Sequence, residues 1–155
     1  MKFLMTIKPA VFLLIIILFF LPFAQIRCDS TVITEMKGID FVTGKEIESG
    51  KNDSDGPSKV EPNKFAVIAF LAAILGFFIS FFSQKIMLAL GEIVSLVGMV
   101  MLLLFKNDLE TQIIQTRESF GLISINYLFA FWASFALFVL YVVFSLSVLL
   151  TQKKG

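Results

Sequence analysis

The chain contains a run of 30 residues, Gly121–Leu150, without a single charged side chain. Two further runs are nearly as long: Phe65–Ser83 has 19 uncharged residues, and Ile86–Phe105 has 20 residues interrupted by Glu92 alone. A helix needs about 20 apolar residues to cross the roughly 30 Å hydrocarbon core of a bilayer. The three runs therefore predict transmembrane helices at 65–83, 86–105 and 122–150.

The composition also indicates that the chain is surrounded by lipid. Of the 155 residues, 57% are hydrophobic and 16% are charged, whereas soluble domains have roughly 45–50% apolar and about 25% charged residues. A larger core cannot absorb the excess, because a chain of this length still exposes about a third of its surface. We therefore expect an all-α integral membrane protein, a bundle of three to four transmembrane helices. Phenylalanine is expected mainly on the lipid-facing sides.

Residues 1–27 allow two interpretations. Lys2 and Lys8 precede the uncharged stretch Pro9–Ile26, which is the layout of a secretory signal peptide. The same stretch also suits a first transmembrane helix. Both alternatives place all later residues identically.

Orientation is predicted from the lysines near the helix ends, because cytoplasmic ends are rich in Lys and Arg. Lys2, Lys8, Lys85, Lys153 and Lys154 fall on one side. The other side carries eight Lys and Arg, six of them among the eight acids of 27–64, so a raw count favours the reverse. The signal-like start leads us to place both termini and the tail 151–155 in the cytoplasm of a bacterial inner membrane.

Residues 28–63 are then extracytoplasmic. The β-branched content of 31–47, with Gly38 and Gly44 as breaks, predicts a short hairpin or two extended pieces. Residues 48–63 are rich in polar residues, Gly and Pro, and are predicted to be a disordered tether. Residues 106–120 show apolar residues at helical spacing, which predicts an amphipathic link on the membrane surface leading into the last helix.

Small residues recur at three- and four-residue spacing on two of the predicted helices. Such stripes allow helix backbones to approach closely inside a membrane. We expect the two stripes to face each other inside the bundle; alternatively, one of them mediates homodimerisation. The helix-packing residues are Ala69, Ala73, Gly76 and Ser80 on the first helix and Gly91, Ser95 and Gly98 on the second.

Glu92 is the ionisable residue inside a predicted span, and a charge at mid-bilayer costs on the order of 2.5–3.5 kcal/mol by insertion scales. One interpretation is a proton- or cation-linked site, with Ser80, Tyr141 or Ser145 as partners at comparable depth. The other is purely structural: an interhelical hydrogen bond, or a contact with Lys85.

Several classes of chemistry are excluded. The chain has no His and one Cys, Cys28, which removes imidazole catalysis and zinc sites built on His or Cys. A net charge of +1 provides no field for nucleic acid. Gly38–Lys45 differs from a phosphate-binding loop in its glycine spacing, and 51–62 lacks the first and last calcium ligands. We predict no catalytic residues, cofactor or metal.

The run Leu21-Pro22-Phe23, then Cys28, then Gly38–Gly44, followed by three apolar spans, has a recognisable layout. It resembles small bacterial multi-pass membrane proteins of the kind found in Bacteroidota, with a signal-like start and a short ectodomain containing paired glycines. This resemblance implies no known activity.

The sequence thus predicts a non-enzymatic membrane protein that acts as a scaffold or accessory subunit. Its expected partners are the lipid bilayer and a homo-oligomer or larger membrane complex. The alternative is an oligomeric transporter or channel component that uses Glu92.

Overall fold

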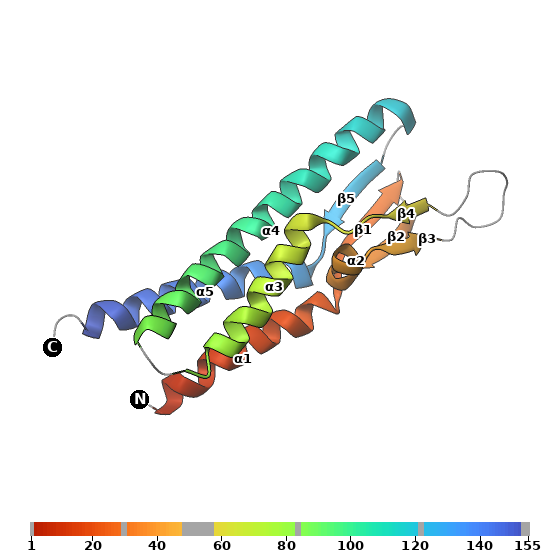
Figure 1. Cartoon of the computed structure of the whole chain (residues 1–155). Coiled ribbons are helices and arrows are strands. Elements are labelled where there is room, and N and C mark those ends of the chain that lie inside the picture. Colours follow the sequence, from red (N-terminus) through yellow and green to blue (C-terminus); the bar gives the residue numbers. More distant parts are fainter. Residues whose placement is uncertain (1, 29–30, 48–57, 83–84, 121–122, 153–155) are drawn as a thin grey trace.

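Four long helices form an elongated bundle, and the strands gather at one of its ends (Figure 1). This computed structural model describes residues 2–28, 31–47, 58–82, 85–120 and 123–152, and 74% of these are helical. The long helices are α1 (Lys2–Phe19), α3 (Lys64–Ile79), α4 (Lys85–Phe120) and α5 (Phe129–Gln152).

The helices alternate in direction. α1 and α4 run toward the strands, whereas α3 and α5 run away from them, so the start of α1 and the end of α5 lie at the same end of the bundle (Figure 1). We call this the helical end and the opposite one the strand end.

The strand end holds a three-stranded antiparallel sheet. β1 (Pro22–Cys28) lies between β2 (Thr31–Lys37) and β5 (Ile123–Tyr127). Along β1, Ala24 and Ile26 pack toward the core, and Gln25 between them lies on the opposite face. This alternation is expected of a strand with one buried face.

A second, smaller layer completes the strand end. The short helix α2 (Gly38–Thr43) is followed by β3 (Lys45–Ile47), which pairs antiparallel with β4 (Ser58–Val60). The carboxylate of Asp40 accepts a 3.0 Å hydrogen bond from the Lys37 N–H at the start of α2. Gly44 then leaves the helix at φ +79°, a conformation that glycine adopts without strain.

The sheet was not expected, because the sequence analysis predicted an all-α membrane domain. The first helix ends at Phe19, whereas the predicted apolar segment continued to Ile26. Pro22 lacks the N–H that a helix interior requires and cannot continue α1. The residues after it instead pair with a strand on each side.

The last apolar run also divides into two elements. Residues 123–127 form β5, and α5 begins only at Phe129. Ile123 and Ile125 alternate with Ser124 and Asn126, and this period of two is a strand pattern. The helix predicted over 122–150 therefore begins later than expected, at Phe129.

Two further segments differ from their predictions. Residues 106–120 continue α4 to 36 residues, about 54 Å at 1.5 Å per residue, because no Gly or Pro interrupts them. They do not form a separate link. Residues 31–47, predicted as a short hairpin or two extended pieces, contain two extended pieces, 31–37 and 45–47, with α2 between them. Ser58–Val60 of the predicted tether is a strand, and 48–57 lie outside the described residues.

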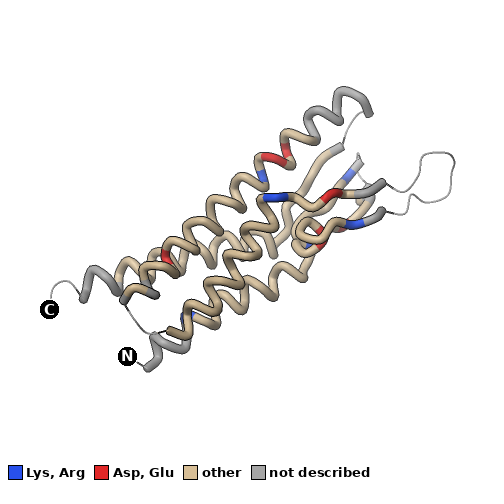
Figure 2. Tube along the Cα trace, in the orientation of Figure 1, with Lys and Arg blue, Asp and Glu red and all other residues tan. Residues whose placement is uncertain are grey.

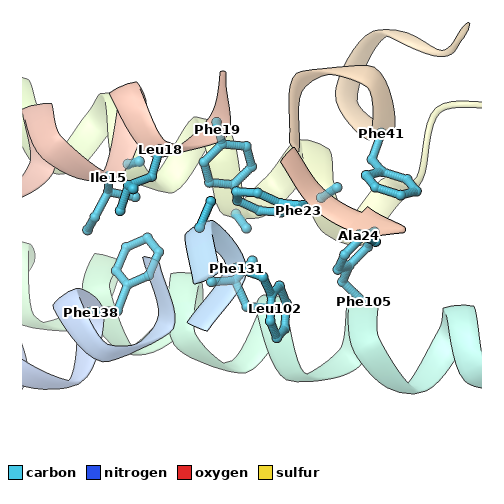
Figure 3. Close-up of a cluster of buried hydrophobic side chains, with 14 of the residues drawn as sticks. Ile15, Leu18, Phe19, Phe23, Ala24, Phe41, Leu102, Phe105, Phe131 and Phe138 are labelled. Carbon is cyan, nitrogen blue, oxygen red and sulfur yellow. The ribbon is translucent and has the colours of Figure 1, made fainter. Parts of the chain in front are cut away.

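Phenylalanine fills the core, contrary to the expectation that it would mainly face lipid. Figure 3 shows α1 and β1 side chains meeting those of α4 and α5. The ring centroids of Phe19 and Phe23 lie 4.8 Å apart, and those of Phe41 and Phe105 lie 4.9 Å apart, in tilted and edge-on arrangements that aromatic pairs prefer. The fully buried rings are Phe12, Phe19, Phe23, Phe105, Phe131 and Phe138.

Candidate functional site

The outside of the helical bundle is apolar on every side that a long helix presents. We call this surface the apolar belt. Its exposed side chains include Leu13, Leu14 and Ile17 of α1; Ile68, Leu71, Leu75 and Phe78 of α3; Leu90, Ile93, Leu96, Val97, Val100, Leu103 and Leu104 of α4; and Leu140, Val143 and Leu146 of α5. The interior, in contrast, contains the buried serines Ser80, Ser95, Ser134 and Ser145. The rest of the interior is apolar, as in a soluble bundle, but a soluble bundle carries polar and charged side chains on the outer faces of its helices.

Within the part of the chain that the structure describes, two helices are long and apolar enough to cross a membrane: Ala89–Gln112 within α4 and Phe129–Ser147 within α5. Only 28% and 33% of their most apolar windows are buried, whereas a core helix of a soluble protein would be mostly buried. The apolar helices Lys8–Phe19 and Lys64–Ile79 are shorter. Among the described residues, charges concentrate toward the two ends of the bundle (Figure 2).

The predicted helix-packing residues are all buried, but the two stripes of small residues do not simply face each other. Their glycines receive aromatic rings from α1 and α5. A methyl group on Gly76 would overlap the ring of Phe12, and one on Gly98 would lie 2.5 Å from the ring of Phe138. The small residues of α3 and α4 therefore make room for these rings.

The three residues of the predicted intramembrane polar site come together at the helical end. Tyr141 of α5 is 4% exposed, and its hydroxyl lies 2.6 Å from the position that a Cβ on Gly91 would occupy. The phenol therefore packs against the α4 backbone at Gly91, the residue before Glu92. Glu92 itself is half-buried. We call these three residues the Glu92 cluster.

Ser80, Ser145 and Lys85 were also proposed as partners of Glu92, and no hydrogen bond or ion pair to Glu92 is seen for the two serines in the described part of the chain. The hydroxyl of Ser80 donates a 2.6 Å hydrogen bond to the carbonyl of Gly76, one turn earlier in α3. Ser145 is buried, and its hydroxyl has no hydrogen-bond partner in the described part of the chain. The side chain of Lys85 lies outside the described residues, so its predicted contact with Glu92 stays a prediction.

A polar junction that the sequence analysis missed lies where the strand end meets the bundle. The Asn63 side chain caps α3 by accepting hydrogen bonds from the N–H groups of Phe65 (3.0 Å) and Ala66 (3.4 Å). Its amide donates a 2.7 Å hydrogen bond to Asp108 on α4, and Gln112 donates a 2.9 Å bond to the same carboxylate oxygen. Asn63 directly precedes an apolar run, which is a signal for a helix start.

This junction borders a cavity of about 570 Å³. Its lining mixes acids, amides and apolar side chains, and includes Glu61, Asn63, Asp108, Leu109 and Gln112. The backbone N–H of Asn63 also donates a 2.8 Å bond to the carbonyl of Phe41 in α2. One residue thus connects α2, α3 and α4.

A second cluster surrounds Lys106 on α4. Its ammonium lies 5.8 Å from the ring centre of Tyr127 and 5.9 Å from that of Trp132, and 3.4 Å from the Glu110 carboxylate. The Tyr127 hydroxyl donates a 3.0 Å bond to the Lys106 carbonyl. Burial raises the pKa of the Tyr127 phenol, and the negative charge of Glu110 raises it further.

The described residues contain no group of three or more His, Cys, Asp or Glu that could hold a metal ion. Comparisons with protein-family models, with curated proteins and with solved structures find no match to this chain.

Proposed function

We propose that this chain is a small multi-pass membrane protein whose four helices lie in the bilayer and whose strand end lies outside it, acting as a non-enzymatic scaffold or accessory subunit. The observation that supports membrane embedding is the apolar belt, which surrounds an interior containing buried serines. The interior serines suit helix packing in lipid, where small side chains let helix backbones approach closely.

The size of the apolar belt is the physical reason for placing the helices in a membrane. Soluble monomers rarely expose contiguous apolar patches beyond a few hundred Å², whereas in hydrocarbon the same side chains need no cover. α3 spans about 24 Å with 16 residues at 1.5 Å each. The exposed rings of Phe81 and Phe82 extend its apolar surface past the end of the helix, and modest local thinning of the bilayer accommodates the remaining difference.

Orientation follows from the same arrangement. α1 begins at Lys2 and α4 begins at Lys85, both at the helical end, and the signal-like start of α1 assigns this end to the cytoplasm. Residues 28–63 are then extracytoplasmic, in a bacterial inner membrane. The resemblance to Bacteroidota-type membrane proteins is part of this proposal.

The scaffold role rests on the outer face of the sheet. Gln25 donates a 2.6 Å hydrogen bond to Glu35 across the β1–β2 pair, and Arg27 donates a 3.3 Å bond to Gln25. These side chains form a polar face on a sheet whose other side is fixed to the bundle core by Ala24 and Ile26. Such a face can bind a partner while the helices anchor it in the membrane.

A photo-crosslinking residue at Glu35 tests this role in native membranes. We expect a discrete adduct with another protein, and no such adduct from the same residue at Leu103 in the apolar belt, where the expected neighbour is lipid. Equal diffuse labelling at both positions would contradict the scaffold role.

The Glu92 cluster supports a second candidate, an oligomeric transporter or channel component. A carboxylate beside a buried phenol and a serine inside an apolar bundle is a typical setting for proton or cation transfer. Glu92→Gln should then abolish pH-dependent flux in proteoliposomes while expression stays unchanged. An unchanged flux would assign Glu92 a structural role.

A further inference from the structure

A groove lies between α1 and α5 near the helical end. It has a volume of about 230 Å³ and is lined by Lys8 and Val11 of α1 and by Leu137, Leu140, Tyr141 and Phe144 of α5. Leu140 is 60% exposed, so the groove opens onto the outside of the bundle. Five of its six lining residues are apolar or aromatic, and Lys8 is the exception.

Lys8 is a half-buried cation for which the described part of the chain offers no ion pair and no hydrogen bond. Among the other lysines with described side chains, Lys45 and Lys106 each have an acidic partner at 3.4 Å, and Lys37 and Lys64, which have none, are exposed to the surroundings. A partly desolvated ammonium is stabilised by a nearby anion. The groove therefore combines an apolar surface with a lysine whose positive charge has no anionic partner in the described part of the chain.

The size and position of the groove select the kind of occupant. Its volume is below the usual 300–1,000 Å³ of a site that encloses a whole ligand, and it is too small for a partner helix about 10 Å across. It suits a segment of one flexible chain. α1 and α4 also begin with Lys2 and Lys85 at this end, which attracts the anionic headgroups of the adjacent leaflet.

We propose that the groove between α1 and α5 holds one acyl chain of an anionic phospholipid, whose phosphate pairs with Lys8. This inference rests on the proposed membrane embedding. The bound lipid fills the gap between the two helices and neutralises the lysine. The contact between the headgroup phosphate and Lys8 gives the preference for anionic lipid. The apolar lining of the groove retains the acyl chain.

Native mass spectrometry of the full chain, released from nanodiscs of equal phosphatidylglycerol and phosphatidylcholine, tests the inference. We expect one retained phospholipid per chain, with about a fivefold preference for phosphatidylglycerol, since a basic residue near an anionic surface contributes on the order of 1 kcal/mol. Lys8→Gln should abolish the preference and keep some bound lipid. Val11→Phe should fill the groove and abolish retention. Lys64→Gln, at the strand end, is the matched control and should change neither.

Equal retention of both lipids by the unaltered chain, or a preference that survives Lys8→Gln, would overturn the inference. Alkaline carbonate washing of membranes separates this failure from failure of the proposed function. If the chain stays in the membrane pellet without showing the preference, only the lipid site is wrong. If carbonate releases the chain, both proposals fail.

Discussion

The side-chain amide of Asn63 donates a 2.7 Å hydrogen bond to the carboxylate of Asp108, 45 residues later in the chain. The same Asn63 caps α3 through its side-chain oxygen. This one contact joins the start of the α3 segment to the part of α4 that extends beyond the apolar run. It is therefore one of the contacts that hold the strand end on the bundle, together with the packing of Phe41 on Phe105.

Asn63→Ala should destabilise the protein by about 2–4 kcal/mol. Loss of a helix N-cap costs roughly 0.5–2 kcal/mol, and loss of a hydrogen bond to a charged group costs about 1.5–3 kcal/mol. Thermal unfolding in detergent, followed by circular dichroism, measures the effect. Lys64→Ala at the exposed neighbouring position is the matched control and should change the unfolding temperature little.

Asn63→Asp separates the two roles of this side chain. The carboxylate still accepts the hydrogen bonds of the α3 N-terminus, but it faces Asp108 without a donor. We expect destabilisation at pH 7 that diminishes toward pH 4, because protonation of either carboxyl restores a donor and removes the repulsion between like charges. A pH-independent loss would indicate that the Asp108 contact contributes nothing.

Gly91→Ala should destabilise the bundle although alanine is the better helix former by about 1 kcal/mol. The added methyl group would lie 2.6 Å from the Tyr141 hydroxyl, and overpacking of this kind typically costs about 1–3 kcal/mol. Combining it with Tyr141→Phe removes the clashing oxygen. A double-mutant cycle on unfolding temperature should therefore show recovery in the double variant. Additive losses would exclude the contact.

Phe41→Ala should loosen the strand end. Phe41 is 3% exposed, and its ring lies 4.9 Å from that of Phe105 on α4. Removing a buried Phe side chain costs about 3–5 kcal/mol. Limited proteolysis should cut within residues 31–63 faster than in the unaltered chain. Val32→Ala, at an exposed position in β2, serves as the control.

The raised pKa of Tyr127 predicts that the free energy of unfolding falls at alkaline pH. Burial and then Glu110 raise the pKa of its phenol in the folded state above the ordinary value of about 10. The resulting stabilisation is fully present below pH 10 and is lost as the pH rises through the folded pKa, because the unfolded chain loses its proton first. Tyr127→Phe should therefore show a smaller loss between pH 9 and pH 11. Phenolate absorbance at 295 nm should show late ionisation of Tyr127 in the folded chain.

The helical bundle could be predicted from hydropathy, since long uncharged runs impose helices on a chain in lipid. The small-residue stripes were predicted to be interior positions, and they are buried. Their partners could not be predicted, because spacing along one helix does not reveal which ring fills the space above a glycine. Phe12 and Phe138 occupy these spaces.

The sheet was missed for a related reason. Residues 22–28 and 123–127 are apolar enough to merge with neighbouring helical runs when hydropathy is averaged over a membrane-length window. Their local signals were present: Pro22 stops a helix, and Ile123 to Asn126 alternate with a period of two. Pairing of β1 with β5 joins segments about 100 residues apart in the chain, and no local pattern encodes such a contact.

The contacts within the Glu92 cluster were also beyond local reasoning. Depth along the helices suggested that Tyr141 lies near Glu92, but it could not reveal that the Tyr141 hydroxyl packs against Gly91, the residue before Glu92. The Asn63–Asp108 bond joins two segments that the sequence analysis assigned to a tether and a surface link. Neither assignment suggested a shared site.

Site-directed spin labelling tests most directly whether the apolar belt lies in lipid. In a Cys28→Ser background, single cysteines at Leu75, Leu103 and Val143 carry the label in turn, with Glu35 as the control outside the belt. In reconstituted bilayers, oxygen should collide with the three belt labels more often than a water-soluble nickel complex does, and the order should reverse at Glu35. Belt labels as accessible to the nickel complex as the Glu35 label would place these helices in water and contradict the account.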